Sequence, residues 1–388
     1  MTDRIYFDHA ASTPVDTRVA AAMTDALKFC GNPSATHGFG RDARTAIDRA
    51  RAAVAGLLGA GLSEIIFTSG ATESSNAAIQ GVFGPIAARF PGRKLRVLAS
   101  PVEHSSVGES LKALAERHGA VVDLLSVDKE GLVSAEEVAE RLTDDTVLVC
   151  VMWVNNVLGT VQPVEEIGTR VAAARASRRP GTPPVYFFCD AVQAASWRQI
   201  LVRSAKVDAL TVSGHKLYGP AGIGALYLRK GVEFQPLLRG GGQEGGRRSG
   251  TENFPGIIGL GAAAELAARE APADAARLGN LRRTFTDVIS VIGRGYGVLG
   301  PSSDHAAPGI VYVASARHSG DILALKLDEA GVAVSSGSSC QASSRQPSSV
   351  VRAVYGEKAA RHGGIRVSFG RSTGPEDVRR LLDELGRI

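Results

Sequence analysis

Short apolar segments of strand type alternate with amphipathic segments of helix type between residues 64 and 228. This alternation restricts the possible folds more than any other feature of the sequence. The expected strands occupy residues 64–68, 94–99, 121–126, 146–153, 185–189, 207–212 and 223–228. The expected helices occupy residues 15–28, 38–58, 74–80 and beyond, 103–118, 134–142 and 167–177. Strands that alternate with helices form a mostly parallel sheet covered on both faces, so the sequence predicts an α/β fold.

Six polar side chains come just after predicted strands of this sheet: Thr72, His104, Asn156, Asp190, Gln193 and Lys216. In open parallel sheets, ligands bind at the carboxyl ends of the strands. Each of these residues alone is more common as a helix cap, a turn residue or a helix surface residue. Six such coincidences are less plausible than one shared site, so we predict that the side chains converge on one crevice.

The turn around Lys216 has the composition of a reactive-lysine site. The expected strand 207–212 ends at Ser213, His215 and Lys216 follow almost at once, and glycines interrupt the chain at 214, 219 and 222. Glycine lets the backbone approach a ligand closely, and a lysine held there suggests an amine that forms a Schiff base. This stretch alone leaves a surface lysine in a turn equally plausible.

Two further segments are typical of phosphate binding. Residues 69–73 link a strand to a helix, so free backbone N–H groups and the positive helix end both face this turn. A simple helix cap by Thr72 or Ser74 is the alternative. Residues 239–251 are rich in glycine and arginine and contain no aromatic residue. We therefore expect a flexible cationic loop near a phosphate, in preference to a nucleic-acid-binding segment.

The four cysteines, Cys30, Cys150, Cys189 and Cys340, are far apart and lack metal-ligand spacing, so no metal site is expected. Cys150 and Cys189 lie in apolar strands and are expected to be buried and inert. Cys340 lies in the serine-rich segment 335–349, where an exposed and mobile thiol is expected to be reactive. An exposed but inert thiol remains the alternative, and the sequence does not decide about Cys30.

The charge and hydropathy of the chain exclude several classes of protein. The chain has 44 Lys and Arg against 39 Asp and Glu, a net charge of +5, which does not indicate a nucleic-acid-binding protein. No uncharged apolar stretch is long enough to cross a bilayer, and the first residues do not resemble a signal peptide. Separated cysteines favour a reducing compartment. We expect a cytoplasmic protein with no membrane contact and no direct nucleic-acid binding.

The pattern changes after residue 253, which indicates a second and smaller α+β domain. Helices are expected at 262–271, 275–290, 321–330 and 375–385, with strands at 310–313 and 365–369. We assign residues 15–262 to a large domain, and residues 1–14 and 263–388 to a small domain that carries the segment 335–349.

Nine short motifs in a fixed order resemble those of the cysteine desulfurases of the NifS/IscS type, a pyridoxal-phosphate-dependent branch of the class V aminotransferases. The motifs lie at residues 8–14, 68–73, 103–104, 155–159, 190–193, 213–216, 248–251, 335–340 and 365–366. Each motif alone is weak, but the ordered set runs along nearly the whole chain. The resemblance implies the fold of the fold-type I pyridoxal-phosphate-dependent transferases.

The resemblance also implies which residues hold pyridoxal 5'-phosphate: Ala71, Thr72, His104, Asn156, Asp190, Gln193, Ser213, His215, Lys216 and Thr251. Lys216 would bond to the cofactor aldehyde, Asp190 would pair with the ring nitrogen, and His104 would stack on the ring and help to move protons. Gln193 and Asn156 would form hydrogen bonds with the ring oxygen and with groups on the substrate side of the cofactor. The phosphate would be held by Ala71, Thr72, Ser213 and His215.

Two further implied roles concern the partner subunit and the substrate. Thr251 would reach the phosphate of the partner subunit, which implies a homodimer. Arg366 would bind the substrate carboxylate with its planar guanidinium.

The implied reaction converts L-cysteine to L-alanine. Lys216 would take the Cα proton, and the Cys340 thiolate would attack the substrate sulfur to form a persulfide. A protein acceptor would then receive this sulfur for iron–sulfur cluster assembly, tRNA thiolation, DNA sulfur modification or a biosynthetic pathway. The chain departs from the common family pattern at Val157, Cys189 and Ser339, none of which removes a catalytic group.

Three alternatives stay open at this point. The chain could be a selenocysteine lyase or another β-elimination enzyme on the same fold, in which Cys340 is not needed as a nucleophile. It could be a non-catalytic scaffold that keeps the fold and binds a partner. It could bind nucleic acid through residues 239–251, which predicts retention on DNA that is sensitive to salt.

Overall fold

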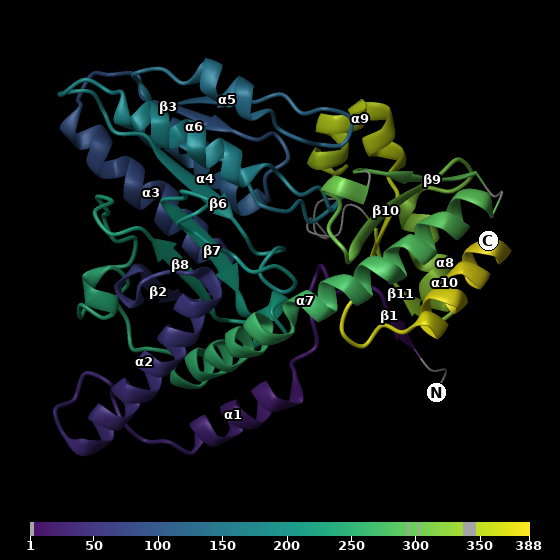
Figure 1. Cartoon of the computed structure of the whole chain (residues 1–388), viewed down its shortest axis with the longest axis horizontal. Helices are drawn as coiled ribbons and strands as arrows, with labels where there is room; N and C mark the ends of the chain where they lie inside the picture. Colours follow the sequence, from purple (N-terminus) through teal and green to yellow (C-terminus); the bar gives the residue numbers. More distant parts are fainter. Residues whose placement is uncertain (1–3, 293–294, 302, 337–346) are drawn as a thin grey trace.

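The computed structural model describes residues 4–292, 295–301, 303–336 and 347–388 (Figure 1). Its centre is a seven-stranded sheet in the order β2 (Ile65–Thr68), β8 (Gly224–Leu228), β7 (Ala209–Ser213), β6 (Tyr186–Asp190), β5 (Thr146–Cys150), β3 (Arg96–Ala99) and β4 (Val121–Leu124). Only β8 runs against its neighbours, because it pairs antiparallel with both β2 and β7. The predicted mostly parallel sheet is confirmed.

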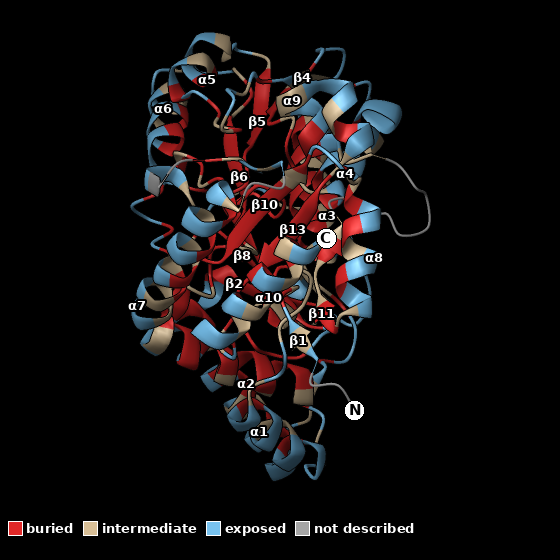
Figure 2. Ribbon diagram, turned by 90° about the vertical axis from the view of Figure 1, so that its right-hand side faces the viewer, coloured by how far each residue is buried: buried red, intermediate tan, exposed pale blue. Residues whose placement is uncertain are grey.

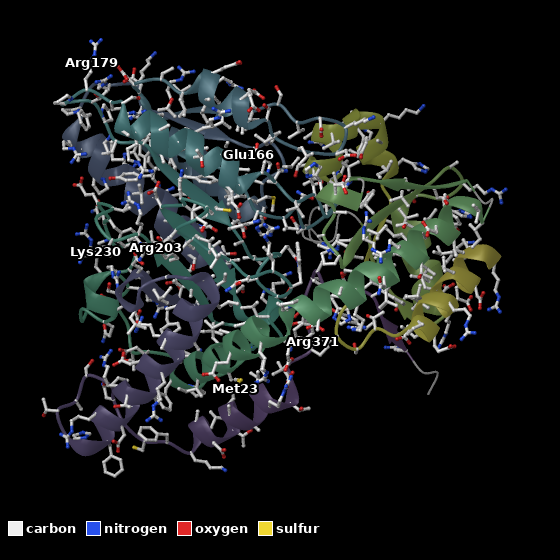
Figure 3. The ribbon with its side chains drawn as sticks, in the orientation of Figure 1. Met23, Glu166, Arg179, Arg203, Lys230 and Arg371 are labelled. Atoms are coloured by element: carbon white, nitrogen blue, oxygen red, sulfur yellow. The ribbon has the colours of Figure 1, made fainter. Side chains whose placement is uncertain are left out.

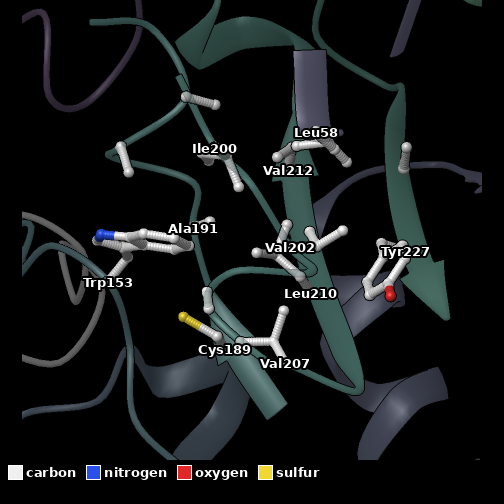
Figure 4. Packing of buried hydrophobic residues seen from close by; sticks show 14 of the residues in the cluster. Leu58, Trp153, Cys189, Ala191, Ile200, Val202, Val207, Leu210, Val212 and Tyr227 are labelled. Carbon is white, nitrogen blue, oxygen red and sulfur yellow. The ribbon is translucent and has the colours of Figure 1, made fainter. Parts of the chain in front are cut away.

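Helices cover both faces of this sheet, which is why its central strands β5 to β8 are buried along their whole length and mostly apolar. The covering helices include α2 (Gly38–Leu58), α3 (Ala71–Arg89), α4 (Ser105–His118), α5 (Ala135–Arg141) and α6 (Val164–Ala176). Successive strand residues point to opposite faces: Phe187 belongs to the core with α2 and α6, and Phe188 to the core with α3 and α4. Figure 2 shows the buried sheet between exposed helix faces, and Figure 4 shows the core around Leu210.

A second unit lies at the C-terminal side of the molecule. Its antiparallel sheet has the order β12 (Ser335–Ser336), β13 (Ile365–Ser368), β10 (Ile310–Ser315) and β9 (Tyr296–Leu299). The accompanying helices are α8 (Gly320–Glu329), α9 (Ser349–His362) and α10 (Pro375–Arg387). Strand β1 (Ile5–Tyr6) pairs with β11 (Val332–Ala333), and Phe7 is buried in the same core as Leu381. The domain limits proposed from the sequence remain a prediction.

One long helix corrects the sequence prediction. We expect separate helices at 262–271 and 275–290, but the structure has a single helix α7 (Phe254–Val291) that contains Pro272. A proline inside a helix removes one backbone hydrogen bond. Here the loss is tolerated because α7 packs on two cores, with Ala267 in the large core and Leu278 in the C-terminal core. It also packs against α1 (Thr17–Leu27).

Several short elements were absent from the sequence prediction. Helix α9 has no clear amphipathic pattern and is kinked at Gly356, whose φ is 84°. Strands β1, β11 and β12 have two residues each, which is too short for a periodic signal. Among the described residues, no helix combines the length and apolar character that crossing a membrane requires.

Asp208 anchors the end of the sheet opposite the predicted site. Its side chain is buried, accepts hydrogen bonds from Phe187 N at 2.7 Å and Arg229 Nε at 2.6 Å, and pairs with Arg175. Removal of one partner from a buried ion pair leaves the other charges without compensation. We therefore expect Asp208→Asn to lower the free energy of unfolding by about 3 kcal/mol, measured by urea denaturation.

The matched control is Asp123→Asn, because Asp123 pairs with Arg96 at 2.7 Å in a more exposed position. Exposed pairs contribute roughly 0.2–1 kcal/mol, so this variant should stay close to the wild type. Equal effects of the two substitutions would contradict the anchoring role of Asp208.

Candidate active site

The carboxyl ends of six strands lie at one edge of the seven-stranded sheet, which we call the carboxyl edge, and β4 is among them because it is parallel to β3. Strands β2 and β7 run the same way because both are antiparallel to β8, and β6, β5 and β3 are parallel to β7. The predicted site residues that follow these strands therefore lie along one side of the molecule. Among them, His104 and Lys216 are both close enough to Asp190 to influence its ionisation.

Lys216 follows β7 in a short 3₁₀ turn (Gly214–Lys216) and points toward the N-terminal arm. Its Nζ donates a hydrogen bond to the carbonyl oxygen of Ala11 at 2.6 Å and another to that of Ala10. Gln193 Nε2 donates to the same Ala10 carbonyl at 2.8 Å. The structure thus brings Lys216 and Gln193 together, and both meet the arm that begins at the C-terminal core.

Asp190 is the last residue of β6 and is buried. Val192 N donates a hydrogen bond to its Oδ1 at 3.0 Å. Burial raises the pKa of the Asp190 carboxyl, whereas His104, the Val192 N–H and Lys216 act in the opposite direction. A buried carboxylate with these neighbours is suited to pair with a protonated ring nitrogen.

His104 forms the N-cap of α4, as its simpler structural interpretation predicts. Its Nδ1 accepts a hydrogen bond from Ser106 N at 3.2 Å and lies 2.9 Å from Ser106 Oγ. Because a backbone N–H can only donate, the accepting Nδ1 carries no proton. The proton of the neutral imidazole is then on Nε2. The cap thereby fixes the ring at the carboxyl edge, beside Asp190.

The turn between β2 and α3 has the properties of a phosphate cradle. Gly70 precedes Ala71, the first residue of α3, with a φ of 153°, and the first N–H groups of a helix have no partner within the helix. The acidic Glu73 in the first turn is paired with Arg248 at 2.9 Å and accepts from Ser69 N at 2.7 Å, so its charge is compensated.

Ser213 and His215 can add hydrogen-bond donors near this turn. Ser213 ends β7 and Thr68 ends β2, and both residues pair with Gly224 of β8, so the two strand ends lie close together. Burial and the adjacent Lys216 lower the pKa of His215 to about 4, so its imidazole is neutral at pH 7. Pyridoxal phosphate has a phosphate, an aldehyde and a basic ring nitrogen. Three features of the site fit these groups: backbone N–H groups and a hydroxyl fit the phosphate, the Lys216 amine fits the aldehyde, and the buried Asp190 fits the ring nitrogen.

Arg366 and Asn156 lie together, but the contact uses the backbone of Asn156. Arg366 is almost fully buried in β13, donates to the Asn156 carbonyl at 2.9 Å and pairs with Asp8 at 2.7 Å. Its Nε is buried and has no hydrogen-bond partner within the part of the chain that the structure describes. Asp8 therefore competes with any substrate carboxylate for this guanidinium. Asp8 begins the motif at residues 8–14, but the sequence assigns it no role.

The side chain that stabilises the loop after β5 is Asn155, for which the sequence predicts no role beyond a turn. Its Nδ2 donates to the Val102 carbonyl at 2.9 Å, and its Oδ1 accepts from the N–H groups of Val157 and Leu158. Asn155 thus fixes the backbone carbonyl that Arg366 contacts.

The turn that carries Lys216 is also tied to the C-terminal unit. Arg371 follows β13, and its guanidinium lies over the Tyr218 ring at 4.4 Å. Arg371 N–H donates to Tyr218 Oη at 2.8 Å, and its Nε pairs with Asp274 of α7 at 2.8 Å. Figure 3 shows Arg371 at the junction of α7 and the N-terminal arm.

Thr72 and Thr251 are exposed, and Cys340 lies outside the described residues. The glycine- and arginine-rich segment 239–251 is held to the large unit by Glu244, whose buried carboxylate pairs with Arg51 at 2.7 Å. The pairing of Arg248 with Glu73 brings the segment to the first turn of α3.

The predicted burial of Cys150 and Cys189 is confirmed, because both are fully buried. Burial raises the pKa of both thiols well above the usual value, and nearby Glu103 adds to this effect. These thiols are therefore protonated and inert. Cys30 is exposed. Within the described ranges, no cluster of three or more His, Cys, Asp or Glu residues is arranged to hold a metal ion.

Comparison with known proteins gives a consistent result. Residues 5–381 match the family model described as "Aminotransferase class-V". The chain is 43% identical over 379 residues to the "Putative cysteine desulfurase IscS 1" of Bacillus subtilis, with 97% of this chain and 96% of that protein covered. It is 40% identical over 389 residues to the "Cysteine desulfurase IscS" of Dictyoglomus turgidum, with 100% and 95% covered. A solved structure titled "NIFS-LIKE PROTEIN" superposes with a TM-score of 0.89 at 34% identity, covering 99% of this chain and 98% of that one.

Proposed function

The chain belongs to the class-V aminotransferase family and is a cysteine desulfurase of the IscS type, and from this premise we propose how its residues carry out the reaction. The family implies dependence on pyridoxal phosphate. We assign the cofactor to the carboxyl edge and the sulfur of L-cysteine to Cys340 as its first acceptor. The observation that carries this proposal is the meeting of Lys216, Asp190 and His104 at one edge of the sheet.

Bound pyridoxal phosphate supplies an aldehyde that bonds to amino groups and a ring that stabilises negative charge at the substrate Cα. The proposed holding residues are those predicted from the sequence. Lys216 would bond to the aldehyde, Asp190 would pair with the ring nitrogen, and the N–H groups of Ala71 and Thr72 would bind the phosphate. The neutral imidazole of His215 and the hydroxyl of Ser213 add hydrogen bonds to this phosphate.

Lys216, Asp190 and His104 divide the proton chemistry. The Lys216 amine would take the proton from the substrate Cα. Asp190 would keep a proton on the ring nitrogen, and the Nε2 of His104 would donate a hydrogen bond on the side of the substrate. Gln193 and Asn156 orient the reacting groups by hydrogen bonds.

Cys340 takes the sulfur. Its thiolate attacks the substrate Sγ, an S–S bond forms and the substrate Cβ–Sγ bond breaks, with the electron pair remaining on the carbon side. After protonation the product is L-alanine, and Cys340 carries a persulfide. A second thiol, on an acceptor protein, then removes the outer sulfur. Such an acceptor would be an iron–sulfur scaffold or a thiolation enzyme, and we propose that the reaction takes place in the cytoplasm.

Arg366 is proposed to bind the substrate carboxylate in exchange for part of its contact with Asp8. Lysine keeps the charge but cannot form the two parallel hydrogen bonds of a guanidinium. We expect Arg366→Lys to raise the KM for L-cysteine roughly 10- to 100-fold, because a hydrogen bond to a charged group contributes about 1.5–3 kcal/mol. Initial rates of alanine release over a range of L-cysteine concentrations measure this effect.

The control for this substitution is Arg96→Lys, at the partly exposed pair with Asp123. It should leave the KM unchanged. An unchanged KM in Arg366→Lys as well would show that the carboxylate binds elsewhere.

Thr251 supports a homodimer, since it is exposed in the segment that leads into α7. In the proposed dimer it donates a hydrogen bond to the phosphate held by the partner subunit. Sedimentation at micromolar concentration would test the stoichiometry.

The test of the proposed function is alanine release from L-cysteine in the presence of a reductant, with the visible spectrum recorded in parallel. A desulfurase reconstituted with pyridoxal phosphate is yellow and yields alanine and sulfide in equal amounts. A yellow protein that releases alanine from selenocysteine but not from cysteine would favour the lyase alternative. A protein that binds no cofactor would favour the non-catalytic scaffold.

A further inference from the structure

Two buried acidic residues, Glu103 and Asp190, contact consecutive residues of the segment after β5: Met152 N donates to the Glu103 carboxylate, and Trp153 N donates to the Asp190 carbonyl at 2.8 Å. Glu103 occupies the turn between β3 and α4, directly before His104, and only 9% of its surface is exposed. Its Oε1 accepts a hydrogen bond from Met152 N at 2.6 Å, while its Oε2 is buried and has no hydrogen-bond partner among the described residues. Asp190 is close enough for the two carboxyl groups to influence each other's charge. The mechanism above assigns no role to Glu103.

Two neighbouring buried carboxylates cannot both be charged without a large cost in free energy, so one of them must hold a proton. The contacts decide which. The anionic form of Asp190 is favoured by the Val192 N–H and by Lys216, and also by His104 when its imidazole is charged. The anionic form of Glu103 is favoured by the Met152 N–H alone. The proton therefore belongs to Glu103 and the negative charge to Asp190.

The ionisation of Glu103 agrees with this assignment. Burial raises the pKa of Glu103 to about 8. The hydrogen bond from the Met152 N–H opposes this rise, and the charge of Asp190 adds to it. Two thiols also lie close to these carboxyl groups, those of Cys150 on β5 and Cys189 on β6. Burial keeps both thiols protonated. His104 and Lys216 face Asp190 from the start of α4 and the turn after β7.

We propose that Glu103 is a positioning residue that stays uncharged at neutral pH and so keeps the negative charge of this pair on Asp190, the partner of the cofactor ring nitrogen. This inference rests on the proposed cofactor site. If Glu103 were ionised, its negative charge would repel that of Asp190 and favour protonation of the Asp190 carboxylate. Neutral Glu103 can still accept the hydrogen bond from Met152 N, and it does not oppose the negative charge of Asp190.

Holoenzyme stability against pH tests the proton directly, with Glu103→Gln as the variant that is neutral at every pH. A group whose pKa is raised in the folded state contributes stability that is present below its unfolded pKa and lost as the pH rises through the folded pKa. Relative to Glu103→Gln, the wild type should therefore lose stability between about pH 5 and pH 8. The ratio of the two unfolding constants should change about tenfold per pH unit, and so about a hundredfold from pH 5 to pH 7.

The matched control is Glu137→Gln, because Glu137 pairs with Arg141 at 2.9 Å and its pKa is lowered by Arg141 and Ser126 despite burial. This variant should be less stable than the wild type at neutral pH, and the difference should vanish as the pH falls. A difference between wild type and Glu103→Gln that is constant from pH 5 to pH 8 would overturn the inference.

The bound cofactor provides a second readout that a merely structural role would not change. The visible absorption of the wild-type holoenzyme should show a transition near pH 8 that is missing in Glu103→Gln. If the variant does not fold, infrared spectra of the wild type should still show a protonated carboxyl band that disappears between about pH 7 and pH 9. Absence of both changes would overturn the inference. A wild type that binds no pyridoxal phosphate would instead contradict the proposed function.

Discussion

A Lys216→Ala variant is expected to release alanine from L-cysteine on the order of 10³- to 10⁴-fold more slowly than the wild type. Alanine removes both the amine that bonds to the cofactor and the base that takes the Cα proton. The hydrogen bonds of Nζ to the arm carbonyls at Ala10 and Ala11 are also lost, but water can replace these partly buried contacts.

Two measurements separate the chemical effect from a folding defect. Borohydride reduction followed by mass spectrometry should attach the cofactor to the wild-type peptide that contains Lys216, and to no peptide of the variant. The control is Lys230→Ala, since Lys230 is exposed beyond the end of β8 (Figure 3). It should keep wild-type activity. Full turnover by Lys216→Ala would overturn the assignment of this lysine.

A Cys340→Ser variant is expected to keep the colour of the holoenzyme but to lose alanine release by about 10³-fold or more. A hydroxyl group does not ionise near pH 7 and is a poor nucleophile toward sulfur. The many serines of the segment 335–349 offer the same weak chemistry, so none of them replaces Cys340. Alkylation with a labelled reagent after one turnover should detect a persulfide on the wild type only.

The matched control for this variant is Cys30→Ser, which changes the exposed thiol among the described residues. It should leave turnover intact. If Cys340→Ser turned over L-cysteine at the wild-type rate, Cys340 would not be the sulfur acceptor, and selenocysteine would be the next substrate to test.

The sheet was predictable because its strands are buried on both faces. Strand β6 (Tyr186–Asp190) has a continuous apolar run that ends in a carboxylate, and that pattern places both the strand and the site residue. The sequence of β7 likewise predicts both a buried strand and, in the glycine-rich turn that follows it, the position of Lys216. The strand-end rule then brings His104, Asp190 and Lys216 to one edge without any knowledge of their contacts.

Other features depend on tertiary contacts that no local pattern encodes. Helix α7 continues through Pro272 because two separate cores hold it on either side. The pairing of Arg366 with Asp8 joins residues that are 358 positions apart. The proton on Glu103 depends on its burial next to Asp190. The sequence does contain a signal for this last residue, because Glu103 directly precedes His104 in a motif, but only the structure gives it a role.

The position of Phe7 has a consequence for how the protein is made. Phe7 is buried in the same core as Leu381 and Leu385 near the other end of the chain, and β1 pairs with β11. Strands of the large sheet are all synthesised by residue 228, so that sheet can assemble while translation continues. The C-terminal core must wait until α10 has left the ribosome. The arm that contacts Lys216 therefore reaches its final place only after α10 is available for packing, so the active site is completed late in folding, well after the large sheet.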